Sequence, residues 1–474
     1  MTDSRTQVAV IGAGPGGYAA AFLAADMGMA VTLIDPAKNP GGVCLYQGCI
    51  PSKALLHVSR LITDAAAAQT CGIFFDPPRI DLKKLRQWKT DVTGGLTEGL
   101  GRLVAQRNIT YQRATAAFAD ASTLILTDPA GESRPLAFDH AIIATGSRAS
   151  TLPLFPTDDP RIWDAKQALS LEMIPESLLV VGGGYIGLEL GSIYAVLGTR
   201  VTVVEILPHL LTGADRDLVR FLQKGLEDRF AAVFPETTVT SVELREDGIV
   251  ATFRGPSAET AEPLHFQRAL VAAGRHPHTD GLALDKAGVA LDADGSIRID
   301  GQCRTTAAAI FAVGDVAGGP FLAHKAAYDA RIAVETIAGK TVVWNPAAIP
   351  AVVYTDPEVA WAGLTETEAR KKGIPVETAR FPWAASGRAA TIGRTDGLTK
   401  MLMDPVTERI LGVGIVGPDA GELISEAVLA IEMGATVKDV GLTIHPHPSL
   451  SETIKEAAEI FHGTAPHTYR PKRK

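Results

Sequence analysis

The chain has 474 residues, of which 46% are hydrophobic and 21% are charged, as in globular proteins with large apolar cores. Its length predicts about three domains. Acidic residues outnumber basic ones by 53 to 45, which gives a net charge of −8, and the one basic block is the short tail at 470–474. We therefore expect no nucleic-acid partner, and we expect the tail to be solvated.

Three features bear on the cell compartment. The first residues run directly into an apolar, strand-like segment at 7–11, which leaves no room for a secretory signal peptide. No uncharged apolar stretch reaches the roughly 18 residues that a membrane helix needs. The four cysteines, too few for an extracellular disulfide framework, are Cys44, Cys49, Cys71 and Cys303. We expect a cytoplasmic protein without membrane association, in which a disulfide is catalytic rather than structural.

An internal repeat dominates the first half of the chain. Residues 7–11 have the pattern of a buried strand, and glycines, an alanine-rich helix and a second strand ending at Asp35 follow. Residues 178–181 begin a second copy, which ends at Glu205. The acid follows the first glycine by 23 positions in both copies. The glycines, spaced G-x-G-x-x-G, are Gly12, Gly14 and Gly17 in the first copy and Gly182, Gly184 and Gly187 in the second.

Each copy has the properties of a dinucleotide-binding βαβ unit. The glycines allow a tight turn, a close approach of the pyrophosphate and close helix packing, and the helix N-terminus attracts phosphate. The terminal acid accepts hydrogen bonds from ribose hydroxyls. Because a carboxylate repels the 2′-phosphate of NADP, Glu205 favours NAD in whichever unit binds the nicotinamide nucleotide. We interpret Arg200 as structural. The alternative is a single doubly wound domain with a coincidental repeat.

Further elements follow the repeat. The segment 141–147 is predicted to be a buried strand with a turn, and the segment 305–315 a strand that delivers an acid after a glycine. Pro346 and Pro350 end the helical pattern of 323–338, so we expect a domain boundary there.

Two capping patterns lie near the C-terminus. Asp419 is predicted to cap a helix, with Glu422 as its capping-box partner. Ser449 and Glu452 fit a second capping box, which accounts for Glu452 without catalysis but leaves His447 unexplained. An imidazole titrates near neutrality and can accept and return a thiol proton.

The cysteine pair lies in the run 41–57. In a regular helix, Cα atoms five residues apart are separated by about 8–9 Å, whereas a disulfide needs about 4.4–6.8 Å. A bond between Cys44 and Cys49 therefore requires a distorted turn, which Gly48 permits. Lys53, one helical turn after Cys49, favours a thiolate or a reduced flavin. We interpret the pair as a redox centre. Two buried thiols or part of a metal site are the alternatives, but no second ligand pair lies nearby, so no metal is expected.

Taken together, the motifs resemble the class I flavoprotein pyridine-nucleotide disulfide oxidoreductases. The resemblance covers essentially the whole chain, through GAGPGG, GCIPSK, GGGYIGLELG, TTAAAIFAVGD, VVYTDPEVAWAG and HPHPSLSE. It is strongest to the members that oxidise dihydrolipoyl groups. The departures from the family pattern are Asp35 in place of Glu, Val43, Tyr46 and Gln47 in the cysteine loop, and Pro446 and Ser449 near the C-terminus.

The resemblance implies an α/β fold with two Rossmann-like dinucleotide-binding domains and a C-terminal α+β dimerisation domain. The implied order is a first segment of the FAD-binding domain at 1–148, an NAD-binding domain at 149–275, a FAD-side central segment at 276–346 and the dimerisation domain at 347–474.

The resemblance also implies roles for individual residues. Cys44 is the thiol that meets substrate and Cys49 the thiol against the flavin, with Lys53 paired to Glu189. His447 is the acid/base, oriented by Glu452. Residues implied to bind FAD are Gly12, Gly14, Gly17, Asp35, Lys53, Thr145, Gly146, Gly314 and Asp315, and those implied to bind NAD are Gly182, Gly184, Gly187, Glu205 and Gly274. His445 is expected to be structural, and His324 is a candidate channel residue.

The implied reaction oxidises protein-bound dihydrolipoyl groups to lipoyl groups with NAD as final acceptor. The implied partners are the lipoyl domains of 2-oxo acid dehydrogenase or glycine cleavage complexes, and the active sites are shared across a homodimer. A reductase of glutathione, mercuric ion or another small disulfide is the alternative. The absence of cysteine after Cys303 disfavours the mercuric version, and Glu205 disfavours NADPH-driven glutathione reduction. The intact cysteines and His447 disfavour a non-catalytic assembly subunit.

Overall fold

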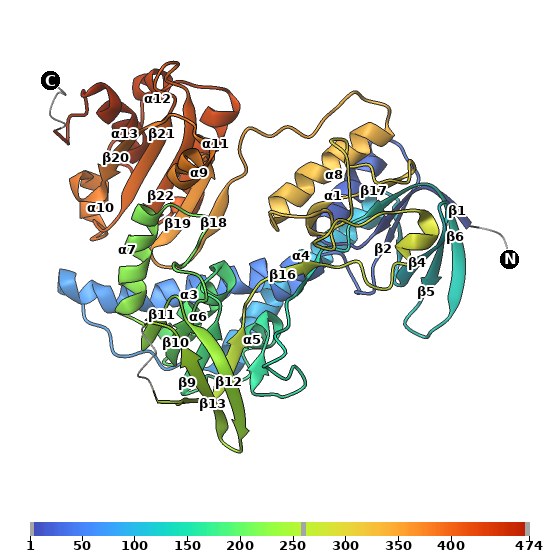
Figure 1. The fold of residues 1–474 in the computed structure, drawn as a ribbon, viewed down its shortest axis with the longest axis horizontal. Coiled ribbons are helices and arrows are strands. Elements are labelled where there is room, and N and C mark those ends of the chain that lie inside the picture. Colours follow the sequence, from blue (N-terminus) through green and yellow to red (C-terminus); the bar gives the residue numbers. More distant parts are fainter. Residues whose placement is uncertain (1–3, 257–261, 470–474) are drawn as a thin grey trace.

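The computed structural model describes residues 4–256 and 262–469. Figure 1 shows three groups of elements, around strands β1 and β6, around β9 and β10, and in the C-terminal part around β21 and β22. The basic tail predicted to be solvated, 470–474, lies outside the described residues. Across the two described ranges, none of the helices combines the length and the apolar character needed to cross a membrane.

The first group is a sheet with helices packed against it. Its strands follow the order β3 (Thr110–Gln112), β2 (Val31–Ile34), β1 (Ser4–Ile11), β6 (Ser133–Ile143), β5 (Thr123–Thr127) and β4 (Thr115–Asp120), and β17 (Ile310–Ala312) also pairs with β6. Helices α1 (Pro15–Asp26) and α8 (Ala323–Ile337) pack against each other. Strands β1 and β2 are parallel and largely buried, because parallel strands are covered on both faces.

The second group repeats the βαβ arrangement. Its parallel sheet has the order β11 (Ala232–Phe234), β10 (Arg200–Val204), β9 (Ser177–Val181), β15 (Arg268–Val271) and β8 (Ile162–Trp163). Helices α5 (Ala165–Ser170), α6 (Tyr185–Val196) and α7 (Arg216–Glu227) belong to it, with an antiparallel sheet of β12 (Thr238–Arg245), β13 (Gly248–Arg254) and β14 (Leu264–Phe266). Since β9, α6 and β10 reproduce β1, α1 and β2, the prediction of two βαβ units is confirmed.

The second group is inserted between two parts of the first. The chain leaves the first sheet after β6, passes through β7 (Ser147–Ala149), and returns through β16 (Arg275–Pro277), which pairs antiparallel with β7. It then reaches the short helices η2 (Leu284–Ala287) and η3 (Gly314–Ala317) and joins β6 through β17, with Ala141 opposite Ile310. The predicted strands at 141–147 and 305–315 are therefore neighbours, and their following turns lie at the same edge of the sheet.

The C-terminal group is an antiparallel sheet covered by helices. Its strands follow the order β18 (Ala351–Val353), β19 (Glu358–Gly363), β22 (Ile410–Gly417), β21 (Leu398–Met403) and β20 (Glu377–Pro382). The helices are α9 (Glu366–Lys372), η4 (Trp383–Ala385), α10 (Gly387–Thr391), α11 (Ala420–Glu432), α12 (Val437–Leu442) and α13 (Glu452–His462). The core contains the fully buried Trp383.

One of the two capping predictions is right in position but wrong in contacts: Asp419 is the N-cap residue of α11, and the predicted capping box with Glu422 does not form. Asp419 stands before α11, but its backbone is left-handed, with φ +60°, and its side chain makes no capping hydrogen bond. Its carboxylate instead accepts a hydrogen bond from Arg60, at 2.7 Å. The second box does form, because Glu452 N–H donates to Ser449 Oγ at 3.3 Å and Ser449 N–H donates to Glu452 Oε2 at 2.8 Å.

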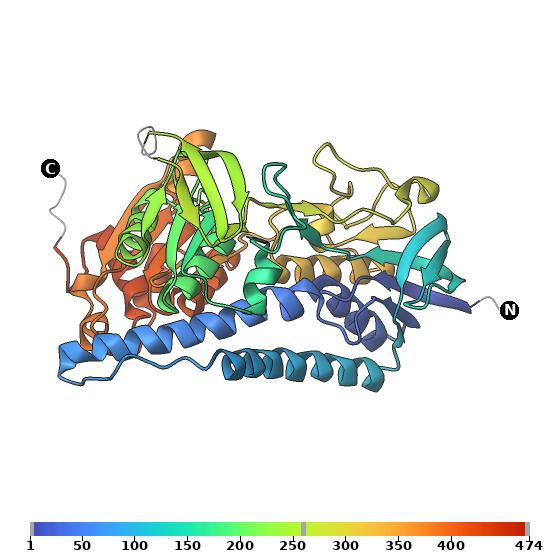
Figure 2. The ribbon, with the colours of Figure 1, turned by 90° about the horizontal axis from the view of Figure 1, so that it is seen from below.

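Helix α3 (Cys49–Ala67) connects the three groups. It follows the short helix α2 (Gly42–Gln47) and continues through η1 (Ala68–Cys71), and α4 (Leu82–Gln106) runs back beside it along the lower edge of the molecule as drawn in Figure 2. Lys53 on α3 pairs with Glu189 on α6, and Arg60, two turns later, pairs with Asp419 before α11. The helix that begins at the second cysteine is thus fixed to both other groups.

Candidate active site

A cavity of about 870 Å³ lies between the first sheet, the cysteine helices and α6. Residues predicted from sequence that line it are Gly12, Gly14, Asp35, Cys44, Cys49, Lys53, Thr145, Gly146, Glu189, Gly314 and Asp315. The structure therefore brings together both cysteines and nearly all residues expected to hold FAD. Gly17 packs behind this wall, since a Cβ there would lie 1.8 Å from Gly12 O.

At one end of the cavity, glycines leave room for a ligand to approach the backbone. Gly12 has φ +95°, and a Cβ on it would lie 2.5 Å from Ala144 O. Gly42 has φ +58°, and a Cβ on it would lie 2.4 Å from Gly14 Cα, at the N-terminus of α1. Sequence reasoning missed Gly42, although it lies within the cysteine run 41–57. Because side chains would fill this cradle and helix N–H groups line it, the donor set fits a dinucleotide pyrophosphate.

The terminal acids of the two βαβ units are held in the same way. Asp35 accepts hydrogen bonds from Ala13 N–H at 2.8 Å and Ala37 N–H at 2.9 Å. Glu205 accepts them from Gly183 N–H at 2.6 Å and Leu207 N–H at 2.8 Å. The backbone contacts fix each carboxylate beside its glycine turn, where a ribose is expected.

The residues expected to bind NAD do not line the cysteine cavity. Gly182, Gly184, Gly187, Glu205 and Gly274 all lie outside its wall. The helix that begins at the second glycine turn nevertheless reaches the cavity, where it contributes Tyr185, Ile186, Glu189 and Leu190. A nucleotide bound at the start of α6 therefore has the cysteine cavity as its neighbour. Sequence reasoning did not single out Tyr185, whose one signal was its place in the glycine motif.

The two cysteines lie on either side of a helix break. Helix α2 ends at Gln47 and α3 begins at Cys49, while Gly48 has φ −144° and ψ −111°. The distorted turn predicted at Gly48 is thus present. Both cysteines are free thiols in this structure, and their side chains are hydrogen-bonded to each other.

This hydrogen bond separates the acidities of the two thiols. Donation from Cys44 is the largest cause that lowers the pKa of Cys49, to about 7, and the Lys53 charge lowers it further against the opposing effects of burial and Glu189. The same hydrogen bond, together with burial, raises the pKa of Cys44. The reduced pair therefore carries its negative charge on Cys49 near neutral pH.

Lys53 is held in place by Glu189. Its Nζ lies 2.7 Å from Glu189 Oε2, and the Glu189 side chain is only 3% exposed. The other oxygen, Oε1, accepts a hydrogen bond from Tyr354 N–H at 3.0 Å, and Lys53 Nζ lies 4.8 Å from the Tyr354 ring centroid. The predicted Lys53–Glu189 pair is present. Tyr354 contacts both members of the pair; the sequence placed it within a family motif but gave it no role.

Asp315 is positioned by the turn after β17. Gly314 has φ +75°, and its N–H donates to Asp329 Oδ2 at 3.0 Å. Asp329 is buried and forms an ion pair with the buried Lys325 at 2.9 Å. Asp315 itself accepts a hydrogen bond from Ser147 Oγ, and Ser147 contacts Arg275. Sequence reasoning missed Ser147 and Arg275, although each ends a segment that it singled out.

His447 and Glu452 pair with each other away from the cysteines. His447 Nδ1 lies 2.9 Å from Glu452 Oε1, while the second oxygen of Glu452 completes the capping box with Ser449. Burial alone raises the pKa of Glu452, but the hydrogen bonds from Ser449 N–H and His447 outweigh it and lower the pKa. The His447 side chain is 71% exposed, and neither residue lines the cysteine cavity. One chain alone does not bring the His447–Glu452 pair to the thiols.

The other two histidines singled out from the sequence, His445 and His324, have local partners. His445 Nε2 lies 2.7 Å from Glu426 Oε1, and its side chain is 4% exposed, consistent with the expected structural role. His324 Nε2 lies 2.8 Å from Pro350 O and lines a separate pocket of about 120 Å³, not the cysteine cavity.

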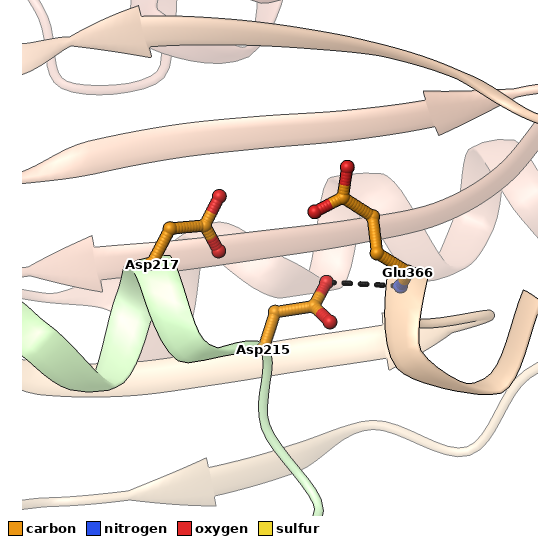
Figure 3. A group of neighbouring side chains, drawn as sticks. All are labelled: Asp215, Asp217 and Glu366. Atoms are coloured by element: carbon orange, nitrogen blue, oxygen red, sulfur yellow. Dashed lines mark hydrogen bonds between the residues drawn. The ribbon is translucent and has the colours of Figure 1, made fainter. Parts of the chain in front are cut away.

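One cluster of carboxylates resembles a metal site. Within the described ranges, Asp215, Asp217 and Glu366 are the group whose carboxylate oxygens lie close enough together, within 4.8 Å of one another, to share a metal ion (Figure 3). The fully buried Lys400 Nζ lies 2.8, 3.0 and 2.6 Å from their oxygens, in that order. The Lys400 ammonium group therefore occupies the position that a metal ion would take. The cluster is an ion-pair network that joins α7 to α9 and β21.

Comparisons with known proteins agree with this arrangement. The family model "Pyridine nucleotide-disulphide oxidoreductase" matches residues 6–330, and the model of the dimerisation domain of the same family matches residues 349–458. A dihydrolipoyl dehydrogenase of Vibrio parahaemolyticus is 46% identical over 98% of this chain and 97% of its own length. The dihydrolipoyl dehydrogenase of Thermus scotoductus is 44% identical over 97% of this chain and 98% of its own.

Solved structures have the same fold. LpdA from Mycobacterium tuberculosis superimposes with a TM-score of 0.89 at 27% identity, covering 97% of this chain and 99% of its own. RclA from Escherichia coli, a HOCl-induced flavoprotein disulfide reductase, gives a TM-score of 0.85 at 27% identity, covering 96% and 99%. The predicted fold class is confirmed, and the dimerisation domain supports a homodimer. The sequence, the fold and the cysteine cavity lead to one conclusion: the chain belongs to the pyridine nucleotide-disulphide oxidoreductase family.

Proposed function

We propose that this oxidoreductase is a dihydrolipoyl dehydrogenase, which oxidises protein-bound dihydrolipoyl groups with NAD. The observation that carries the proposal is the cavity in which Cys44 and Cys49 lie with Lys53, Asp35 and Asp315. The identity of 46% over nearly full length to the Vibrio parahaemolyticus dihydrolipoyl dehydrogenase supports the substrate class. The partners are then lipoyl domains of 2-oxo acid dehydrogenase or glycine cleavage complexes, in the cytoplasm.

FAD fits the first unit and NAD the second. The glycine cradle of α1 and Asp35 would hold the adenosine and pyrophosphate of FAD, and Asp315 its ribityl region. Glu205 and the glycine turn before α6 would hold NAD. When bound, FAD supplies a two-electron relay between the dithiol and NAD. The expected segments at 1–148, 149–275, 276–346 and 347–474 are the corresponding domains.

The residues of this chain divide the thiol chemistry between them. In the oxidised enzyme Cys44 and Cys49 form a disulfide. His447 of the partner subunit accepts the proton of a dihydrolipoyl thiol, and the resulting thiolate attacks Cys44 Sγ and displaces Cys49 as a thiolate. The second substrate thiol then attacks the substrate sulfur of the mixed disulfide and passes its proton to Cys44, so that the lipoyl disulfide is released, Cys44 leaves as a thiol and the first proton stays on His447. The two electrons lost by the substrate now lie on the cysteine pair.

The electrostatics match that division. The lowered pKa of Cys49, about 7, makes it the better leaving group and keeps it charged. The raised pKa of Cys44 keeps it protonated, so that it hydrogen-bonds to the Cys49 thiolate. Glu452 holds the His447 ring through Nδ1 and leaves Nε2 to meet the substrate.

A paired assay of the purified protein tests the proposal. The protein should form NADH from dihydrolipoamide and NAD, and should oxidise NADPH with glutathione disulfide far more slowly. Rapid glutathione reduction with NADPH and no turnover of dihydrolipoamide would contradict the substrate assignment while leaving the family membership intact.

A further inference from the structure

A buried hydroxyl joins an arginine to the carboxylate expected beside FAD. Ser147 is 7% exposed, and its Oγ contacts both Arg275 and Asp315. Arg275 Nε donates to Ser147 Oγ at 2.8 Å, and Arg275 Nη2 donates to the backbone oxygen of Ser147 at 2.6 Å. Ser147 Oγ donates in turn to Asp315 Oδ2. All three residues line the large cavity.

Chemistry fixes the direction of these hydrogen bonds. A guanidinium group can only donate and an ionised carboxylate can only accept, whereas a hydroxyl carries one proton and two lone pairs. Arg275 therefore supplies its N–H to the Ser147 lone pair, and the single Ser147 proton points at Asp315. One orientation of the hydroxyl satisfies both charged groups, and it fixes Asp315 Oδ2.

The same three residues come from three segments that are far apart in the sequence. Ser147 is where the chain leaves the first sheet, Arg275 is where it returns from the second, and Asp315 follows the strand that rejoins the first. Ala149 lies opposite Arg275 in the antiparallel pair of β7 and β16. The Arg275 side chain reaches back along this pair, so the hydrogen bonds connect the crossing between the two units to the turn that carries Asp315.

We propose that Ser147 and Arg275 are positioning residues, which hold the Asp315 carboxylate for the ribityl chain of FAD and couple it to the placement of the NAD-binding unit. The inference rests on the proposed function, because it takes Asp315 as a ligand of FAD. Removing the Ser147 hydroxyl takes its hydrogen bond away from Asp315 and from Arg275 Nε, and removing the Arg275 guanidinium leaves the hydroxyl without the donor that orients it toward Asp315. In either case binding of FAD and of NAD should weaken together.

Four variants separate this role from general stability. Ser147→Ala removes the hydroxyl, Ser147→Thr retains it, and Arg275→Met removes the guanidinium. Ser150→Ala is the matched control, because Ser150 lies on the same crossing and its contact there is a backbone hydrogen bond from its N–H to Gly274 O at 3.0 Å. FAD is removed from the full-length protein, and its dissociation constant on rebinding is measured by quenching of flavin fluorescence. Thermal unfolding of the FAD-free protein is followed in parallel.

The expected result is a FAD dissociation constant at least about tenfold higher in Ser147→Ala and Arg275→Met, near wild type in Ser147→Thr and Ser150→Ala. The KM for NAD should rise in the same two variants. The double variant Ser147→Ala/Arg275→Met should bind FAD no more weakly than about the worse single variant, because both changes break one network. Additive losses in the double variant, or wild-type FAD binding by Ser147→Ala, would overturn the inference. A wild-type protein that does not bind FAD would instead overturn the proposed function on which it rests.

Discussion

Replacing Lys53 by methionine tests the electrostatic origin of the acidity of Cys49. The Lys53 ammonium lies 2.7 Å from the buried Glu189 carboxylate, and its charge helps the hydrogen bond from Cys44 to lower the pKa of Cys49 to about 7. Methionine keeps most of the apolar length of the side chain and removes the charge. It also leaves Glu189, which raises the pKa of Cys49, without its cation.

Both consequences act in the same direction. The thiolate loses an attractive charge and gains an uncompensated repulsive one, so the pKa of Cys49 should rise by about one unit or more, equivalent to about 1.4 kcal/mol. The thiolate fraction at pH 7 should then fall from about one half to about one tenth or less. The ordinary pKa of a cysteine here is 9.0, above the folded value of about 7. The Cys49 thiolate therefore contributes its full stabilisation of the folded protein above about pH 9, and this contribution is lost as the pH falls through about 7. Lys53→Met should therefore lower the free energy of unfolding most at high pH.

The pH dependence of alkylation measures this pKa. The experiment uses reduced protein carrying Cys44→Ser, whose hydroxyl can still donate to Cys49, and Cys71→Ser, which removes an exposed thiol. The midpoint of the rate with iodoacetamide should move upward in Lys53→Met, remain near the parent in Lys53→Arg, and move partly back in Lys53→Met/Glu189→Gln. An unchanged midpoint in Lys53→Met would refute the electrostatic account.

Three further predictions follow from the site. His447→Gln should lower turnover with dihydrolipoamide by at least about 10²–10⁴-fold while FAD remains bound, and mixing it with inactive Cys44→Ser under subunit exchange should restore activity; no recovery despite proven exchange would place both residues in one chain. Wild-type protein should have a higher kcat/KM for NAD than for NADP, and replacing Glu205 while adding a nearby cation should narrow the difference; a wild-type preference for NADP contradicts the role of Glu205. Lys400→Met should lower the free energy of unfolding by about 3–5 kcal/mol, because three carboxylates lose their buried cation, whereas the exposed Lys340→Met should have little effect; denaturant unfolding measures both, and equal stabilities would refute the ion-pair network.

Local patterns predicted those parts of the fold that depend on local physics. The two glycine turns and their acids were predicted because strand burial, a positive φ and a carboxylate at fixed spacing are all properties of short segments. The break at Gly48 was predicted because helix geometry and disulfide geometry disagree over five residues. In each case the sequence carries the constraint within about 25 positions, as the distance from Gly12 to Asp35 illustrates.

Contacts between segments that are distant in the sequence were harder to predict. Asp419 is a residue type that often caps helices, but its carboxylate accepts a hydrogen bond from Arg60 on α3, 359 positions away, and not from the backbone of α11. The Ser147–Arg275 contact spans 128 positions and depends on how β7 pairs with β16. Ser147 and Arg275 each end a segment that the sequence singled out, but nothing in the local pattern distinguishes them from the serines and arginines that are common in turns and on surfaces. The role of His447 stays a prediction, because its exposed side chain lies outside the cysteine cavity of its own chain.

The claim that electrons pass from a dihydrolipoyl group through the Cys44–Cys49 pair to FAD is tested most directly by anaerobic reduction. Dihydrolipoamide is added to the FAD-loaded, oxidised protein without NAD, and the visible spectrum is recorded for wild type, Cys44→Ser and Cys49→Ser. The wild type should develop a long-wavelength charge-transfer band from the Cys49 thiolate against the flavin, and Cys49→Ser should never show it. Dihydrolipoamide should reduce neither variant at an appreciable rate. A band that persists in Cys49→Ser and disappears in Cys44→Ser, or rapid flavin reduction in either variant, would contradict the assignment of the two thiols.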